Sequence, residues 1–140
     1  MVGQERVKRL VSPHALAGIR VLVVEDHDDT REFVAAVLAQ YGAEVTTATS
    51  VRTALAAFER AKPDVLVSDI AMSGEHGYDL IHAVRTLAVE QGGRVPALAL
   101  TAYVRPEERE RALAAGYTRH LAKPIDPIDL ASAVAQLAQR

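Results

Sequence analysis

A chain of 140 residues with 49% hydrophobic residues is long enough to bury one substantial core, so we expect a single domain. The formal net charge of −2 gives no reason to expect nucleic acid or an anionic membrane surface as a partner. The absence of cysteine excludes disulfides and thiolate metal sites, and no apolar run approaches the length of a membrane span. The N-terminus also lacks the hydrophobic block of a signal peptide, which favours a soluble, cytoplasmic domain.

Residues 1–18 differ in composition from the rest of the chain. Their first half is polar and basic, and Ser12-Pro13 and Gly18 interrupt any long helix. We therefore expect a linker or docking arm over residues 1–18, or else an ordinary frayed terminus, followed by the domain proper over residues 19–140.

The first predicted strand, Ile19 to Val24, runs into a dense group of acids at residues 25–29. Four acids in five residues are costly to bury, so we expect them at an edge of the fold. The segment from Asp29 to Glu32 has the spacing of a capping box, which predicts that Asp28 and Asp29 mainly start a helix. The inward face of that helix is predicted to contain Phe33, Val34, Val37, Leu38 and Tyr41.

A second strand is predicted at Ala43 to Ala48, and Thr49 or Ser50 can cap the helix that follows. The apolar run after Asp64 is typical of a parallel strand covered on both faces. No turn residue precedes Asp69, which therefore lies at or just past the carboxyl end of this central strand. Ligands of open α/β sheets bind at that edge.

The rest of the chain repeats the alternation of helix and strand. A helix is predicted around residues 80–87, a strand over residues 95–101, and a helix from Pro106 to Ala115. The apolar face of the helix from Pro106 to Ala115 is thin, essentially Leu113 with alanines, which predicts weak anchoring. A final strand over residues 117–122 precedes Lys123-Pro124 and a closing helix whose inward residues are predicted to be Leu130, Val134 and Leu137.

Strands and helices thus alternate five times with short connections. This pattern predicts right-handed crossovers, a parallel sheet and helices on both of its faces.

Four of the five predicted strands end in polar groups that are expected to meet at one edge: Glu25 and Asp26, Asp69, Thr101, and Lys123. Carboxylates held together repel one another, and a hard divalent cation relieves that repulsion. Oxygen ligands with no histidine or cysteine nearby favour Mg²⁺ or Mn²⁺ over zinc. A lysine opposite such a cluster suits a second anion, such as a phosphoryl group. Together these groups favour phosphoryl transfer, with Asp69 as the nucleophile. Each residue by itself also has an ordinary structural role, as a cap, a strand end or a surface charge.

The chain resembles the receiver domains of two-component response regulators over about residues 19–139. The motifs that carry the resemblance are Val21-Leu22-Val23-Val24-Glu25-Asp26, Asp64-Val65-Leu66-Val67-Ser68-Asp69-Ile70-Ala71-Met72, Ala99-Leu100-Thr101-Ala102 and His120-Leu121-Ala122-Lys123-Pro124. The resemblance implies a flavodoxin-like, doubly wound (βα)5 three-layer sandwich with parallel sheet order 2-1-3-4-5.

The resemblance also implies a function. Asp69 is expected to accept phosphate from a histidine kinase or a histidine phosphotransfer protein, and Thr101 and Lys123 to hold the phosphoryl oxygens. The expected Mg²⁺ ligands are Asp26, Asp69 and the backbone carbonyl of Ala71, with Glu25 acting mainly through water. The expected partner surface is at about residues 105–139. The Lys123-Pro124 bond is commonly cis in this family.

Some residues depart from the family pattern. His120 aligns with the switch aromatic of the family, as in receivers of hybrid histidine kinases, or is an ordinary strand histidine. Ala71 and Tyr103 hold the positions at which the family tunes dephosphorylation, and the small Ala102 lies between Thr101 and Tyr103. Tyr103 is expected to shield an acyl phosphate, or only to pack against the neighbouring helix.

Two other functions remain open. One is a phosphorylation-independent interaction module on the same fold. The other is a Mg²⁺-dependent phosphatase, although such enzymes usually carry a second Asp where this chain has Ala71. Because the sequence ends after the closing helix, we expect a receiver without an output domain: a stand-alone receiver, a phosphorelay intermediate, or a piece excised from a hybrid histidine kinase. We expect it to signal and not to turn over a substrate.

Overall fold

The computed structural model describes residues 11–72, 75–102 and 105–139. Its main sheet has five parallel strands in the order β2-β1-β3-β6-β7, which is the predicted order 2-1-3-4-5 when the sheet strands are counted along the chain. The strands are β1 (Arg20–Val24), β2 (Glu44–Ala48), β3 (Val65–Asp69), β6 (Ala97–Thr101) and β7 (Arg119–Ala122).

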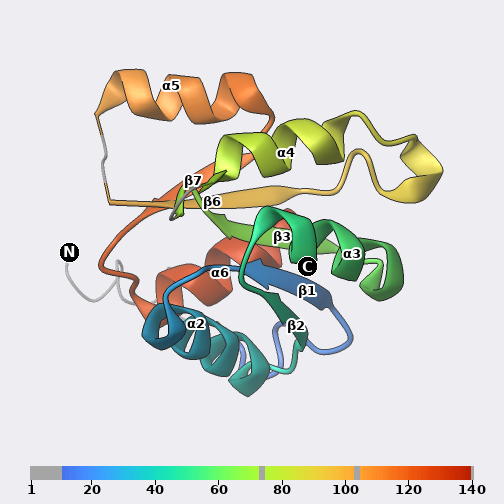
Figure 1. The fold of residues 1–140 in the computed structure, drawn as a ribbon. Helices are drawn as coiled ribbons and strands as arrows, with labels where there is room; N and C mark the ends of the chain where they lie inside the picture. The colour runs from blue at the N-terminus through green and yellow to red at the C-terminus, as the bar shows by residue number, and fades with distance from the viewer. Residues whose placement is uncertain (1–10, 73–74, 103–104, 140) are drawn as a thin grey trace.

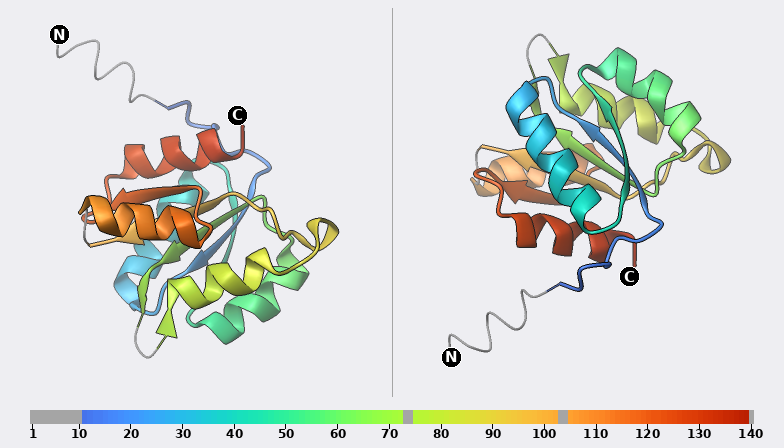
Figure 2. Two further views of the ribbon diagram at one scale, coloured as in Figure 1. Left: turned by 90° about the horizontal axis from the view of Figure 1, so that it is seen from above. Right: turned by 90° about the horizontal axis from the view of Figure 1, so that it is seen from below.

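Helices cover both faces of this sheet, so the predicted three-layer architecture is confirmed (Figures 1 and 2). One face packs against α2 (Asp28–Gln40) and α6 (Pro127–Leu137). The other face packs against α3 (Val51–Ala61), α4 (Gly77–Arg85) and α5 (Pro106–Ala115). Short elements complete the fold: a two-stranded ladder of β4 (Ala71–Met72) with β5 (Glu75–His76), and the 3₁₀ turn η1 (Val89–Gln91).

Alternation along the central strands explains why their sequences are largely apolar. In β1, Val21 and Val23 face the α2–α6 core, whereas Leu22 and Val24 face the α3–α4–α5 core. Successive side chains of a strand point to opposite faces, and both faces of this sheet are covered, so apolar residues fill most positions. The central strand β3 is buried at all five positions, including its last residue, Asp69.

Helix boundaries confirm some predicted caps and correct one. Ser50 caps α3 in a capping box with Thr53, as expected. The capping box predicted from Asp29 is wrong, because the N-cap of α2 is His27, which makes no side-chain capping bond. Asp28 and Asp29 lie within the first turn instead, where their negative charge stabilises the helix end.

Three hydrophobic residues depart from the predicted core. Phe33 and Leu113 were expected to face inward but are 40% and 45% exposed. In α5 the residue buried against the sheet is Ala112, the neighbour of Leu113 in the sequence. Leu16, placed by composition in the N-terminal arm, is fully buried in the α2–α6 core, so the arm contributes to packing.

Within the described residues, none of the helices is both long enough and apolar enough to span a membrane.

Candidate functional site at the carboxyl edge of the sheet

The carboxyl ends of the parallel strands bring the predicted polar residues to one edge. Glu25 directly follows β1, Asp69 ends β3, Thr101 ends β6 and Lys123 directly follows β7. Backbone hydrogen bonds fix two of these positions, because Glu25 N donates to Ala48 O at 3.1 Å and Lys123 N donates to Thr101 O at 2.8 Å. The hydrogen bonds of the sheet therefore continue past the strand ends and hold Glu25 and Lys123 in position.

Lys123 links two of the carboxylates. Its Nζ lies 3.2 Å from Asp69 Oδ1 and 3.3 Å from Glu25 Oε1. Glu25 has no exposed surface and Asp69 is only 2% exposed, so water screens neither charge well. Buried carboxylates are tolerated only when they are paired, and Lys123 is the cation that pairs them.

The electrostatics of the site remain unbalanced despite this lysine. Burial, together with the nearby Glu25 charge, raises the pKa of Asp69 above its ordinary value, against the opposing effect of Lys123. Burial alone would lower the pKa of Lys123. The negative charges of Asp69 and Glu25 have the larger combined effect, so the pKa of Lys123 is raised above its ordinary value. Asp69 Oδ2 is buried and has no hydrogen-bond partner among the described residues.

The acidic residues lie close enough to share a cation. Glu25, Asp26, His27 and Asp69 each offer one ligand atom, and these four atoms lie within 4.8 Å of one another. The buried, unsatisfied oxygen of Asp69 is an observation that fits a hard divalent cation. Carboxylate oxygens in this arrangement therefore suit Mg²⁺ or Mn²⁺.

The structure corrects the expectation that no histidine lies near these oxygens. His27 Nδ1 is 3.1 Å from Asp26 Oδ1 and 3.2 Å from Glu25 Oε2. The hydrogen bond with Glu25, followed by the charge of Asp26, raises the pKa of His27. His27 directly follows Glu25 and Asp26 in the sequence, and this position already indicated that its ring could lie near their carboxylates. We instead interpreted the residues after Asp26 only as the start of a helix.

Sequence reasoning also missed the part that Gly77 and Tyr117 play behind the site. Gly77 N donates to Ile70 O at 2.7 Å, and a Cβ at Gly77 would lie 2.6 Å from the carbonyl oxygen of Asp69. The Tyr117 hydroxyl donates to Gly77 O at 2.8 Å, and burial raises the pKa of Tyr117, so the phenol keeps its proton. Only glycine permits this close approach, which links the loop after Asp69 to the turn between α5 and β7.

The remaining predicted residues have less defined roles. Ala71 begins β4, Ala102 is exposed just after β6, and Tyr103 lies outside the described residues. His120 lies in β7 opposite Ala99, and burial and then the charges of Arg109 and Arg119 lower its pKa. The Lys123-Pro124 peptide bond is cis, as expected.

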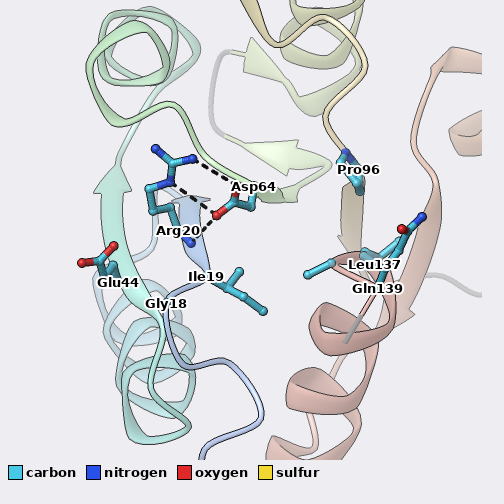
Figure 3. Close-up of a pocket in the computed structure, with 9 residues that line it drawn as sticks. Gly18, Ile19, Arg20, Glu44, Asp64, Pro96, Leu137 and Gln139 are labelled. Carbon is cyan, nitrogen blue, oxygen red and sulfur yellow. Dashed lines mark hydrogen bonds and ion pairs between the residues drawn. The ribbon is translucent and has the colours of Figure 1, made fainter.

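A separate hollow lies at the opposite edge of the sheet (Figure 3). Its charged pair is Arg20 and Asp64, joined by a contact of 3.2 Å between Nη2 and Oδ1. Asp64 also accepts a hydrogen bond from the Arg20 backbone N–H at 2.8 Å. This pair fixes the start of β1 to the start of β3, and the hollow lies away from the carboxylate cluster.

The fold and the site define a class: flavodoxin-like α/β domains with an acidic pocket and a lysine at the carboxyl edge of the sheet. A family model, the response regulator receiver domain, matches residues 21–135. The chain belongs to this family.

Solved structures agree. The chain superposes on the chemotaxis response regulator CheY4 of Vibrio cholerae with a TM-score of 0.78 and 34% identity, covering 87% of this chain and 98% of that one. A putative response regulator from Chloroflexus aurantiacus gives a TM-score of 0.80 and 32% identity, with the same coverage of 87% and 98%.

Sequence relatives differ in how much of their length this chain spans. An uncharacterized 14.6 kDa protein of Leptolyngbya boryana is 45% identical over 121 residues, which cover 86% of this chain and 91% of that protein. The hybrid signal transduction histidine kinase D of Dictyostelium discoideum is 28% identical over 89% of this chain, but the match spans only 8% of the kinase. Relatives therefore include both short proteins and domains of large kinases.

Proposed function

We propose that this chain is a phosphoacceptor in a two-component or phosphorelay pathway, and that Asp69 receives the phosphoryl group from a phosphohistidine of a histidine kinase or phosphotransfer protein. The observation that carries the proposal is the buried Asp69 carboxylate beside Lys123 at the sheet edge, with Oδ1 paired and Oδ2 lacking a hydrogen-bond partner among the described residues. A buried carboxylate oxygen without a hydrogen-bond partner is costly to stability, which supports a functional role for Asp69.

The proposed step is an in-line transfer. A carboxylate oxygen of Asp69 forms a bond to phosphorus while the bond from phosphorus to the donor imidazole nitrogen breaks. The donor imidazole leaves with the electron pair and takes up a proton, and Asp69 becomes an acyl phosphate. Lys123 then pairs with a phosphoryl oxygen, and Thr101 donates a hydrogen bond to another.

We propose Mg²⁺, or Mn²⁺, as the cofactor. Asp26, Asp69 and the carbonyl of Ala71 would hold the ion, with Glu25 contributing through water. When bound, the cation supplies positive charge that offsets the negative charge of the transferring phosphoryl group. Lys123 carries a single positive charge and pairs with Asp69 and Glu25, so it cannot by itself offset the charges of three acids.

In this proposal the domain acts in the cytoplasm as a signalling acceptor, which assists its own phosphorylation and dephosphorylation but turns over no separate substrate. Phosphorylation changes partner binding through about residues 105–139, with His120, Ala102 and Tyr103 tuning the response. The low burial of α5 supports this output surface, because a helix with a single buried residue is shifted at little cost.

The test is the intact mass of the protein after incubation with acetyl phosphate, with and without Mg²⁺. We expect one phosphoryl adduct that requires Mg²⁺, is removed by hydroxylamine, and is absent in Asp69→Asn. Asp79→Asn, which changes an exposed acid at the start of α4, is the matched control and keeps the adduct. Failure to form the adduct together with failure to bind Mg²⁺ and beryllofluoride would contradict the proposal and favour the phosphorylation-independent interaction module.

A further inference from the structure

We propose that His27 supplies an imidazole nitrogen to the cation site, making it a mixed carboxylate–imidazole centre that binds Mn²⁺ and later transition metals such as Co²⁺ and Zn²⁺ more tightly than Mg²⁺. This inference rests on the cation site of the proposed function and adds a residue to it. It concerns which divalent ion the pocket selects.

The position of the imidazole suits a ligand. Nδ1 lies 3.1 Å from Asp26 Oδ1 and 3.2 Å from Glu25 Oε2. Donors in adjacent positions around an octahedral ion, with ligand distances of about 2.1 Å, are about 3.0 Å apart. The ring nitrogen and the Asp26 carboxylate therefore already have the spacing of neighbouring ligands around one ion, and Glu25 is close enough to contribute through water.

The backbone fixes this position. His27 is the N-cap of α2, with extended φ and ψ of −82° and 120°, and its carbonyl accepts the first helical hydrogen bond from Arg31 N at 2.9 Å. Its own N–H donates to Glu25 Oε2 at 3.2 Å, and Arg31 Nη1 donates to Glu25 O at 3.1 Å. The helix start thus holds the imidazole against the acids, while 65% exposure of the side chain leaves a path for an ion from solvent.

A second observation points to a cation at this place. Asp69 is 2% exposed, and its buried Oδ2 has no hydrogen-bond partner among the described residues. Lys123 contacts Oδ1 of Asp69 and Oε1 of Glu25, whereas His27 contacts the other oxygen of Glu25, Oε2. Lysine and histidine therefore contact different oxygens of the buried carboxylates, and His27, unlike Lys123, can ligate an ion.

The chemistry of the donor predicts the selectivity. Mg²⁺ prefers oxygen ligands and gains little from imidazole, whereas affinity for a nitrogen-containing site rises from Mn²⁺ through Co²⁺, with Zn²⁺ also well suited to imidazole. Replacing His27 is expected to weaken Mn²⁺ binding by about tenfold, a loss typical of a group that supports a metal site. Mg²⁺ binding is expected to change by about twofold at most, because its ligands remain.

The test uses Mn²⁺ as the probe and electron paramagnetic resonance as the readout. Loss of the free-ion signal measures binding, and pulsed measurements on the bound ion detect coupling to a ligating ¹⁴N nucleus. We expect ¹⁴N coupling in the wild type and in His82→Ala, a control that removes a histidine from α4, and no coupling in His27→Ala. His27→Asn, which keeps a residue suited to the N-cap, is expected to fold like the wild type and also lose the coupling.

The outcomes separate the two proposals. Bound Mn²⁺ without ¹⁴N coupling in the wild type, or coupling that persists in His27→Asn, overturns the role of His27 but leaves the cation site of the proposed function intact. In that case the imidazole only donates a hydrogen bond to the acids. Absence of any Mn²⁺ or Mg²⁺ binding overturns both the role of His27 and the proposed cofactor.

Discussion

The two last helices of the chain differ sharply in how they are anchored, although they follow one another around β7. Helix α6 buries six residues, from Leu130 to Leu137, against α2 and the sheet. Helix α5 buries only Ala112 and exposes Leu113. Lys123 directly follows the strand between them, so the proposed phosphoryl site lies beside one firmly packed helix and one loosely packed helix. We therefore expect a change at the site to move α5 more easily than α6.

The largest expected effect comes from the firmly packed side. Leu130→Ala removes a side chain with no exposed surface and leaves a cavity between α6 and the sheet. We expect a loss of about 3 kcal/mol in the free energy of unfolding, the usual range for a buried leucine. Urea unfolding measures it, and a loss below about 1 kcal/mol would show that α6 is no better anchored than α5.

A change at the site between the helices tests the charge imbalance. Asp69→Asn removes a buried carboxylate whose pKa is raised, and we expect a gain of about 1 to 2 kcal/mol at pH 7 without divalent cations. A raised pKa means that the folded state binds the proton more tightly, so wild-type stability increases as pH falls through that pKa. The advantage of the variant therefore shrinks as pH falls toward the ordinary aspartate pKa of 3.8. Unfolding measured in EDTA from pH 7 to pH 4 checks this, and a gain independent of pH would contradict it.

The link between α5 and the loop after Asp69 is expected to have a smaller effect. Tyr117→Phe removes the hydrogen bond that the buried hydroxyl donates to Gly77 O, which costs about 1 kcal/mol. Amide hydrogen exchange is expected to accelerate in α5 and not in α6. Tyr41→Phe at the end of α2 is the control, and equal acceleration in both helices would contradict a specific link to α5.

The smallest effect is expected on the loosely packed side. Leu113→Ala trims a side chain that is 45% exposed, so stability should change by no more than about 0.5 kcal/mol. Paired with Leu130→Ala, it compares the same substitution in two adjacent helices. A loss near that of Leu130→Ala would mean that α5 is anchored by Leu113 after all.

The alternation of apolar strands and amphipathic helices determined the fold class, because covering both faces of a sheet demands largely apolar strands. The strand order was predicted by the resemblance to receiver domains, and the structure has that order. The carboxyl ends of those strands determined which polar residues meet, and the structure brings Glu25, Asp69 and Lys123 into contact. Local patterns were less reliable on α5, where the sequence favoured Leu113 as the inward residue and the structure buries Ala112.

Only the tertiary structure decided which residues distant in sequence are in contact. It also decided which of two possible roles a residue such as His27 takes. The sequence alone could not pair Tyr117 with Gly77, because that hydrogen bond depends on how closely α5 and the loop after Asp69 approach each other. Nor could it distinguish His27 as a helix start from His27 as a member of the acidic cluster. Its ring direction depends on the position of Glu25 and Asp26, which pairing of the strands fixes only in the folded chain. Spacing in sequence thus determined which residues reach the edge, and side-chain packing decided which of them touch.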